Sequence, residues 1–374
     1  MAQKTEVCIL TGSLIDPARV PERKIGGVEI YTYSLAKAMR ARSIPVSILQ
    51  CAPRRFECEL DIGVKVMGMR YATLKRWVAD HPQALSVLAD HSFVTVDTPR
   101  VDLFVQHGVY WDGFLRRFDD LLRHSLHILK HRLFRWQSFR VLKAIGRQSQ
   151  QILTVDTNFQ NWYRGLWPWD AIDNKCVYIP NFAFLHPREK AFAKWRDTAV
   201  IRIVFARRFT SARGTLIWAR VAGKILQEFP QVVFLMAGDG EDKVKMQQLC
   251  PPSERVAYRM FTHGELTKEL LSCHISVVPT LFCEGTSLAL LESMAAGCAC
   301  IATPIGGLPN ILRDGINGLM CPPDSDRIGQ AVRQLLNDLT LCERLARAGW
   351  ETVQENHTEE QWAQRVGSLV QSMM

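Results

Sequence analysis

The feature that most constrains this chain is the stretch 275–297, in which a short apolar run, a polar loop and a helix-forming run follow one another. The first five residues are typical of a buried strand, and the run that begins near Thr286 favours a helix. Gly285, Thr286 and Ser287 then lie where the free N–H groups of a helix start collect. This order predicts an anion-binding site.

Glu292 is unusual because the helical run around it is apolar on nearly every face. An ionised carboxylate is costly to bury without a partner, so we expect a polar group to contact it. A second carboxylate, Glu284, stands just before the loop. The two glutamates are separated by seven residues.

Two carboxylates with this spacing, one before a helix and one inside it, resemble the signature of glycosyltransferase family 4, a group of retaining enzymes with the GT-B fold. The resemblance continues through the residues 298–303, the turn 306–309 and the segment 314–319. It implies that Glu284 hydrogen-bonds hydroxyls of the transferred sugar and that Glu292 binds a ribose. The donor-binding residues that it implies in this loop are Gly285, Thr286, Ser287 and Leu288.

The length of 374 residues favours two domains. With 47% hydrophobic and 22% charged residues, the composition is that of a soluble globular protein. No run approaches about 18 uninterrupted apolar residues, and no signal-peptide pattern is present, so we expect a cytoplasmic protein. The eleven cysteines are scattered, and Cys298 and Cys300 alternate along an expected strand, which favours packing over a metal site.

The net charge of +9 is concentrated in the first half of the chain. Residues 1–185 carry 25 Lys and Arg against 17 Asp and Glu, whereas residues 186–374 carry 21 against 20. An anionic partner would therefore meet the first half.

Much of this charge lies in the segment 113–147, which contains nine Lys or Arg and two Asp. Its leucines recur at spacings of three and four, which predicts a basic amphipathic helical segment. Two interpretations stay open: a core-facing helix with a solvated basic side, or contact with an anionic membrane surface or acceptor. The aromatic residues of the segment 162–169 indicate packing or lipid contact.

The beginning of the chain predicts a strand at Val7–Thr11, a polar loop, and a helix of about 15 residues after Gly26 and Gly27. Paired glycines between a strand and a helix let the backbone approach a phosphate, although a mere tight turn is an equal alternative. In the resembled family the matching glycines lie under the donor diphosphate. Further strands are expected at Val46–Gln50, Val64–Met67, Phe93–Val96 and Val101–Gln106.

His107 directly follows the last of these strands and precedes Gly108. Ligands of doubly wound sheets bind at the carboxyl ends of strands, so His107 should face the ligand crevice. It resembles the active-site histidine of the family, which contacts the transferred sugar.

A second set of the same kind follows, with strands at Ile201–Ala206 and Val232–Ala237 around a helix at Thr215–Phe229. The turn 207–214 between them resembles the diphosphate-binding loop of the family. Alignment on Gly214 places Arg208 on the family's arginine, Arg213 on its lysine, and Arg207 on a glycine. The resemblance therefore implies that Arg208 and Arg213 are catalytic residues that stabilise the departing diphosphate.

The two strand-and-helix sets predict an α/β protein with two facing Rossmann-like domains, and the resemblance implies the GT-B fold. It also implies an acceptor-binding domain, 1–183, to which a C-terminal helix, 358–374, crosses back. A nucleotide-sugar-binding domain occupies 184–357. Asp324 precedes a helical run and is expected to cap it rather than to bind a metal. We expect no metal and no cofactor, because cationic side chains can neutralise the donor diphosphate.

The function that the resemblance implies is that of a retaining, metal-independent hexosyltransferase. Such an enzyme moves a sugar from a nucleotide diphosphate-sugar to a glycan or lipid-linked acceptor, and we expect it to act in bacterial polysaccharide or lipopolysaccharide assembly. The segment 113–147 would attach it to the inner face of the plasma membrane. The alternatives are a nucleotide-sugar epimerase of the same fold, or a non-catalytic basic protein that binds nucleotide-sugar or nucleic acid. Nucleic acid is disfavoured, since no reading motif is present.

Overall fold

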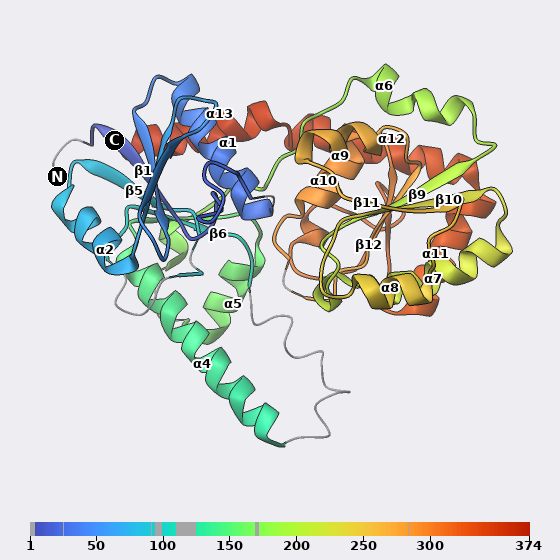
Figure 1. Ribbon diagram of the computed structural model, residues 1–374, viewed down its shortest axis with the longest axis horizontal. Coiled ribbons are helices and arrows are strands. Elements are labelled where there is room, and N and C mark those ends of the chain that lie inside the picture. Colours follow the sequence, from blue (N-terminus) through green and yellow to red (C-terminus); the bar gives the residue numbers. More distant parts are fainter. Residues whose placement is uncertain are drawn as a thin grey trace. The chain divides into compact units, whose positions relative to one another are not determined.

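The computed structural model describes residues 4–24, 26–90, 92–93, 99–109, 125–168, 172–282 and 284–374, apart from the side chains of 125–135, 173 and 263. The chain divides into two compact units. The first comprises Met1–Gly108, Asp120–Pro180 and Glu360–Met374, and the second comprises Val109–Asp119 and Asn181–Glu359 (Figure 1). The predicted domain boundary at residue 183 falls three residues after the division at Pro180. No helix in the described part of the chain is long and apolar enough to cross a bilayer.

The first unit is built on an eight-stranded sheet in the order β3-β4-β2-β1-β5-β6-β7-β8. Its strands are β1 (Glu6–Thr11), β2 (Val46–Cys51), β3 (Phe56–Glu59), β4 (Lys65–Met69), β5 (Ala84–Leu88), β6 (Leu103–Gln106), β7 (Gln151–Thr154) and β8 (Cys176–Tyr178). Every pair of neighbours is parallel except β3 and β4. Its helices are α1 (Gly27–Ala41), α2 (Tyr71–Asp80), α4 (Ser125–Gln148), α5 (Asn158–Leu166) and α13 (Glu359–Ser372).

The last helix, α13, packs on the first unit, although the second unit precedes it in the chain. Its Trp362 is 2% exposed and meets the ring of Tyr31, on α1, edge to face at 5.1 Å between centroids. At the end of the chain, the N–H of Lys4 donates to the carbonyl of Met374 at 3.1 Å. Figure 1 shows α13 beside α1 and β1. This return of the final helix was implied by the family resemblance.

The strand β5 was missed by the sequence analysis, which placed a strand at Phe93–Val96 instead. Phe93 lies in a turn, and residues 94–98 lie outside the described residues. The polar Ser86 in the middle of β5 concealed the strand. It is buried because its N–H and Oγ–H both donate to Asp102, at 2.8 and 2.9 Å, and Asp102 pairs with Lys4 at 3.0 Å. A tertiary partner therefore makes a polar residue compatible with the core.

The second unit has a six-stranded, fully parallel sheet in the order β11-β10-β9-β12-β13-β14. The strands are β9 (Ile201–Ala206), β10 (Val232–Ala237), β11 (Val256–Arg259), β12 (Ile275–Val278), β13 (Ala299–Ala302) and β14 (Leu319–Met320). The helices are α6 (Arg188–Phe192), α7 (Thr215–Glu228), α8 (Lys243–Leu249), α9 (His263–Leu270), α10 (Leu288–Ala295), α11 (Ser325–Asn337) and α12 (Leu339–Asn356). The predicted bounds of β9 and β10 are confirmed.

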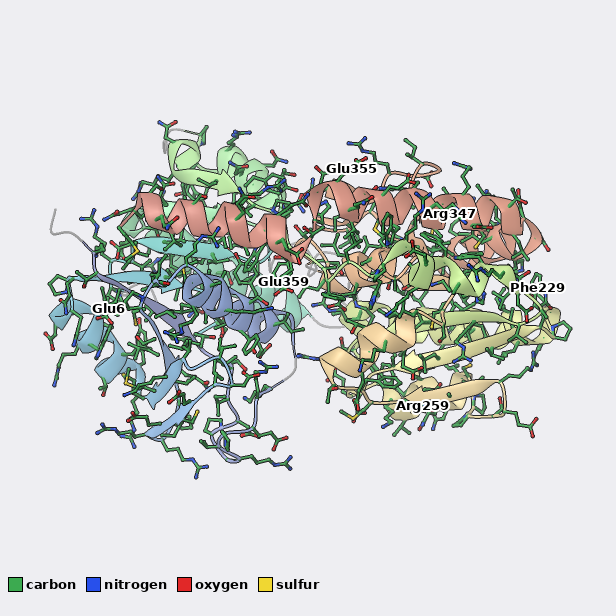
Figure 2. The ribbon with its side chains drawn as sticks, turned by 90° about the horizontal axis from the view of Figure 1, so that it is seen from above. Glu6, Phe229, Arg259, Arg347, Glu355 and Glu359 are labelled. Atoms are coloured by element: carbon green, nitrogen blue, oxygen red, sulfur yellow. The ribbon has the colours of Figure 1, made fainter. Side chains whose placement is uncertain are left out.

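This second sheet is buried on both faces, as its nearly continuous apolar strands require. One core cluster contains Phe205 and Trp218, and another contains Leu290 and Met294. Side chains fill the space between the sheet and its helices (Figure 2). The guanidinium carbon of Arg347, on α12, lies 4.5 Å from the centroid of the Phe192 ring.

Helix α11 begins as predicted, with Asp324 as its N-cap. The Oδ1 atom of Asp324 accepts hydrogen bonds from the N–H groups of Asp326 and Arg327 at 2.9 and 3.1 Å. This carboxylate therefore satisfies the free N–H groups of the first helical turn.

Candidate functional site

The loop between β12 and α10 forms the centre of the candidate site in the second unit. Ser287 is the N-cap of α10, and its Oγ accepts from the N–H of Leu290 at 3.4 Å. The helix begins at Leu288, two residues later than expected, because Thr286 and Ser287 belong to the cap and the loop. Gly285, Thr286 and Ser287 thus stand at the positive end of a helix, where an anion is stabilised.

The carboxylate of Glu284 lies between two arginines. Its Oε2 accepts from Nη2 of Arg207 at 2.6 Å and from Nη1 of Arg213. Nη1 of Arg207 also donates to Oγ1 of Thr280 at 3.2 Å, at the end of β12. We call Arg207, Arg213 and Glu284 the ion cluster.

The ion cluster is mostly shielded from water. The side chains of Arg207 and Glu284 are 5% and 11% exposed, whereas that of Arg213 is 33% exposed. Burial alone would raise the pKa of Glu284, but the charges of Arg207 and Arg213 hold that pKa below its ordinary value. Burial lowers the pKa of Arg207, and Glu284 opposes this shift. The carboxylate therefore stays ionised and keeps two cations at the loop.

Two glycines allow the loops of the ion cluster to meet. Gly214 has φ +74°, and a Cβ there would lie 1.9 Å from the carbonyl oxygen of Pro279. Gly306 has φ +59°, and a Cβ there would lie 1.9 Å from the carbonyl oxygen of Glu284. The same carbonyl accepts from the N–H of Gly307 at 2.8 Å. The turn 306–309 of the resemblance therefore holds the backbone of Glu284 in place.

Arg207 is the member of the site that the sequence analysis missed. The alignment on Gly214 gave the phosphate contact to Arg208 and Arg213. The side chain of Arg208 is exposed, whereas the side chains of Arg207 and Arg213 contact Glu284. Arg207 directly follows β9, a central strand, and such positions at the carboxyl ends of parallel strands gather ligand-binding groups. That signal could have identified it. Contacts of Arg208 and Arg213 with phosphate stay predictions.

Glu292 lies on α10 and is 8% exposed. Burial raises its pKa to about 8, and the nearby charge of Arg207 partly offsets this rise. Arg207 is thus electrostatically coupled to both glutamates. Its contact with a ribose stays a prediction.

The remaining predicted site residues belong to the first unit. Gly26 is the N-cap of α1 and Gly27 is its first residue. His107 follows β6, and its Nε2–H donates to the carbonyl of Ala89, at the end of β5, at 2.8 Å. Its ring also meets Tyr31 edge to face at 4.7 Å. Burial lowers the pKa of His107, so the imidazole is neutral and Nδ1 can act as an acceptor.

Residues 201–338 match the family model described as glycosyl transferases group 1. This segment includes the whole ion cluster and Glu292. An uncharacterized glycosyltransferase of Methanocaldococcus jannaschii is 27% identical over 161 residues, which are 42% of this chain and 41% of that protein. The phosphatidyl-myo-inositol mannosyltransferase of Mycobacterium tuberculosis is 26% identical over 200 residues, 49% of this chain and 50% of that protein. The chain therefore spans about half or less of the length of each relative.

The crystal structure of Anabaena HepE in complex with UDP resembles the whole chain. It covers 98% of this chain and 100% of that one, with a TM-score of 0.68 at 16% identity. At this identity the likeness shows the fold, and it confirms the predicted GT-B class.

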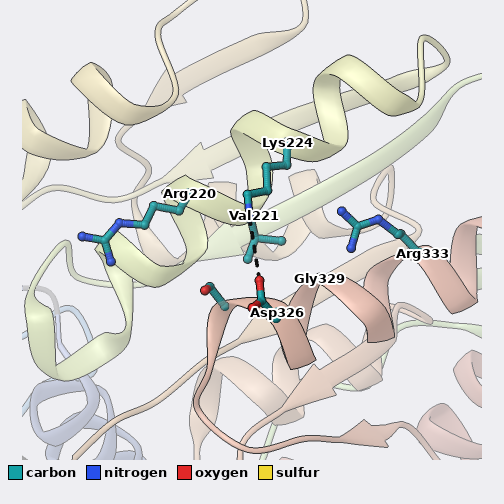
Figure 3. Close-up of a pocket in the computed structure, with 7 residues that line it drawn as sticks. Arg220, Val221, Lys224, Asp326, Gly329 and Arg333 are labelled. Atoms are coloured by element: carbon teal, nitrogen blue, oxygen red, sulfur yellow. Dashed lines mark ion pairs between the residues drawn. The ribbon is translucent and has the colours of Figure 1, made fainter.

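A separate pocket lies between α7 and α11, within the residues 201–338 that match the family model (Figure 3). Its lining carries both signs of charge, with Lys224 and Asp326 paired at 3.7 Å across it. The lining contains Arg220, Val221, Lys224, Ser325, Asp326, Gly329 and Arg333, none of which is a predicted site residue. The ion cluster therefore remains the candidate site.

The first prediction concerns Glu284, whose carboxylate occupies two cations that an external anion could use. We expect Glu284→Gln to bind inorganic pyrophosphate about three- to tenfold more tightly than the wild type in isothermal titration calorimetry, since a charge-assisted contact no longer competes. Glu254→Gln, at an exposed position, removes the same charge and should have little effect. Weaker or unchanged binding by folded Glu284→Gln would contradict the competition.

The second prediction uses the pKa of Glu292, about 8 in the folded chain against an ordinary 4.5. Between these values the unfolded chain loses a proton that the folded chain keeps, so this group's contribution to the free energy of unfolding is lost as pH rises. Glu292→Gln should therefore gain in melting temperature relative to the wild type from about pH 5 to about pH 8. The exposed Glu241→Gln should show no such trend. A pH-independent difference for Glu292→Gln would rule out the raised pKa.

Proposed function

We propose that this chain is a retaining glycosyltransferase that moves a hexosyl group from a nucleotide diphosphate-sugar to a glycan or lipid-linked acceptor. The observation that carries the proposal is the ion cluster: two arginines converge on one carboxylate beside the N-terminus of α10. The cluster lies in the segment that matches glycosyl transferases group 1.

The arrangement suits the departure of a diphosphate. As the bond between the sugar C1 and the phosphate oxygen breaks, negative charge grows on the leaving phosphate. Arg207, Arg213 and the N–H groups at the start of α10 can stabilise this charge. Retention follows if the acceptor hydroxyl attacks C1 on the face that the phosphate leaves and passes its proton to a phosphate oxygen. These cations supply the positive charge, so transfer proceeds without a metal.

The two glutamates take different parts in this reaction. When the diphosphate binds the arginines, the carboxylate of Glu284 is released towards the hydroxyls of the transferred sugar. Glu292 hydrogen-bonds the ribose through a carboxyl group that is protonated near neutral pH and can therefore both donate and accept. HepE, a protein of the same fold, binds UDP, which supports a nucleoside diphosphate as the leaving group.

The acceptor is lipid-linked, and the first unit meets an anionic membrane surface through α4. This helix carries six basic and no acidic residues, namely Lys130, Arg132, Arg135, Arg140, Lys143 and Arg147. Its Trp136 is 56% exposed. Arg140 lies over the ring of Trp136 at 4.6 Å, and Lys143 lies over that of Trp167 at 5.0 Å. Cations beside indole rings suit an anionic headgroup layer.

Other observations support this placement. One end of α4 projects away from the sheet of the first unit (Figure 1). A relative is named for a phosphatidyl-myo-inositol acceptor, which is a membrane lipid. We therefore assign the chain to the assembly of bacterial polysaccharide or lipopolysaccharide at the inner face of the plasma membrane.

The third prediction tests the donor. In a thermal-shift panel of UDP-, GDP- and ADP-sugars, one donor should stabilise the chain by about 2.7 kcal/mol at 100 times its dissociation constant. Its transfer to a lipid-linked acceptor should survive EDTA. Glu292→Gln should weaken binding of donor and free nucleotide alike, by about 10- to 150-fold, because the ribose contact is the same in both. A chain that no nucleotide stabilises would refute the proposal, and epimerisation without an acceptor would favour the epimerase.

The fourth prediction tests the membrane surface. Changing Arg140 and Lys143 to Gln should weaken sedimentation with vesicles containing phosphatidylglycerol by about 30-fold, since each cation contributes about 1 kcal/mol near such a surface. The matched control is a double variant of the second unit in which Lys245 and Arg327 are replaced by Gln. It has the same change of charge and should bind the vesicles almost like the wild type. Equal binding by both double variants would exclude α4 as the contact.

A further inference from the structure

Asn181 joins the candidate site to the connection between the units. It directly follows Pro180, the last residue of the first unit's second segment. Its side chain is 7% exposed, and its Nδ2–H donates to the carbonyl oxygen of Thr286 at 2.6 Å. This contact spans 105 residues of sequence. Asn181 is the first residue of the segment Asn181–Glu359 of the second unit. It thus holds the loop at the start of α10.

The contact fixes the direction of a second group. The carbonyl of Thr286 and the N–H of Ser287 belong to the same peptide unit, and in a planar trans peptide they point in opposite directions. Holding the carbonyl on Asn181 therefore turns the N–H of Ser287 away from Asn181. In the described part of the chain, no protein group accepts from that N–H. It is left available to an anion at the helix start.

Asn181 is itself held by the segment through which the chain leaves the second unit. Its carbonyl accepts from Nδ1–H of His357 at 3.2 Å. Next to it, the N–H of Ala183 donates to the carbonyl of His357 at 2.8 Å, and the N–H of Glu359 donates to the carbonyl of Ala183 at 3.2 Å. The segments 181–183 and 357–359 are therefore hydrogen-bonded to each other. This pairing fixes the backbone that carries the amide side chain of Asn181.

We infer that Asn181 is a positioning residue for the donor. Its amide orients the Thr286–Ser287 peptide so that the N–H of Ser287 faces the donor diphosphate. This inference rests on the proposed function for the identity of the anion, but the orientation of the peptide is a property of the chain without ligand. Asn181 touches neither the reacting atoms nor the ion cluster, and it acts through the loop.

The chemistry of asparagine is required at this position. Only the NH2 end of the amide can donate to a carbonyl, so the amide has one orientation, and its Oδ1 accepts no hydrogen bond from the described residues. Aspartate has the same shape, but its ionised carboxylate cannot donate and would repel the carbonyl of Thr286. Asn181→Asp therefore removes the contact and keeps the side-chain volume. Asn181→Ala removes both the contact and the volume of the amide group.

The matched control is Asn317, a second buried asparagine of the same unit. It is 4% exposed, and its Nδ2 donates to the carbonyl of Ile311 and to Oγ1 of Thr352, both at 3.0 Å. Asn317→Ala should cost at least as much stability as Asn181→Ala. It holds a loop that contains no residue of the candidate site, so it should leave anion binding unchanged.

The experiment has two readouts on the full chain. The first is hydrogen–deuterium exchange without ligand, in which both Asn181 variants should speed exchange of the amides 285–289, while Asn317→Ala should not. The second is calorimetric binding of inorganic pyrophosphate, which both Asn181 variants should weaken by about two- to tenfold.

The results test two proposals separately: the positioning role of Asn181 and the proposed glycosyl transfer. Unchanged exchange of 285–289 in a folded Asn181 variant overturns the positioning role, whatever the ligand. Faster exchange with wild-type pyrophosphate affinity also overturns it, because Asn181 would then only stabilise the loop. If the wild type binds pyrophosphate but no nucleoside diphosphate, the proposed transfer fails, while the exchange and pyrophosphate data still decide the role of Asn181.

Discussion

The second unit depends on one buried electrostatic contact, the ion cluster of Arg207, Arg213 and Glu284. Charges lose hydration when they are buried, and removing one partner would leave the other uncompensated. The three residues come from the end of β9, the turn before α7, and the loop before α10. Their pairing therefore fixes three loops relative to one another, and the left-handed glycines Gly214 and Gly306 let those loops approach closely enough.

The parallel sheet determines where this contact can form. Strands β9 and β12 are neighbours at its centre, and both run in the same direction, so the residues that follow them emerge at one edge. Arg207 follows β9, and Thr280 and Glu284 follow β12. The start of α10 is delivered to the same edge, which adds the partial positive charge of its N–H groups. Fixed cations and helix dipole thus act on one small volume.

Two glutamates eight positions apart acquire opposite properties in this environment. Burial raises the pKa of each carboxyl group, and the outcome depends on how many cations oppose it. Glu284 contacts two arginines and has a lowered pKa, whereas burial raises the pKa of Glu292 to about 8 and the charge of Arg207 offsets part of this rise. Arg207 therefore acts on both residues, but burial decides the charge state of Glu292, and the two arginines decide that of Glu284. Because their pKa values differ, the ionised Glu284 can compete with an anion, and the protonated Glu292 can serve as a neutral hydrogen-bonding group.

The sequence by itself determined the elements whose signals are local. The apolar runs of β9 and β10, the helix after Gly27, the cap at Asp324, and the glutamates flanking a helix start could all be predicted, because periodicity and capping act within a few residues. Only the tertiary structure decided the features that depend on distant partners. Ser86 belongs to a strand because Asp102 satisfies it, Arg207 rather than Arg208 contacts Glu284, and Asn181 holds Thr286. Each of these contacts joins residues that are 16 to 105 positions apart, and a buried polar group reveals its role only when its partner is known.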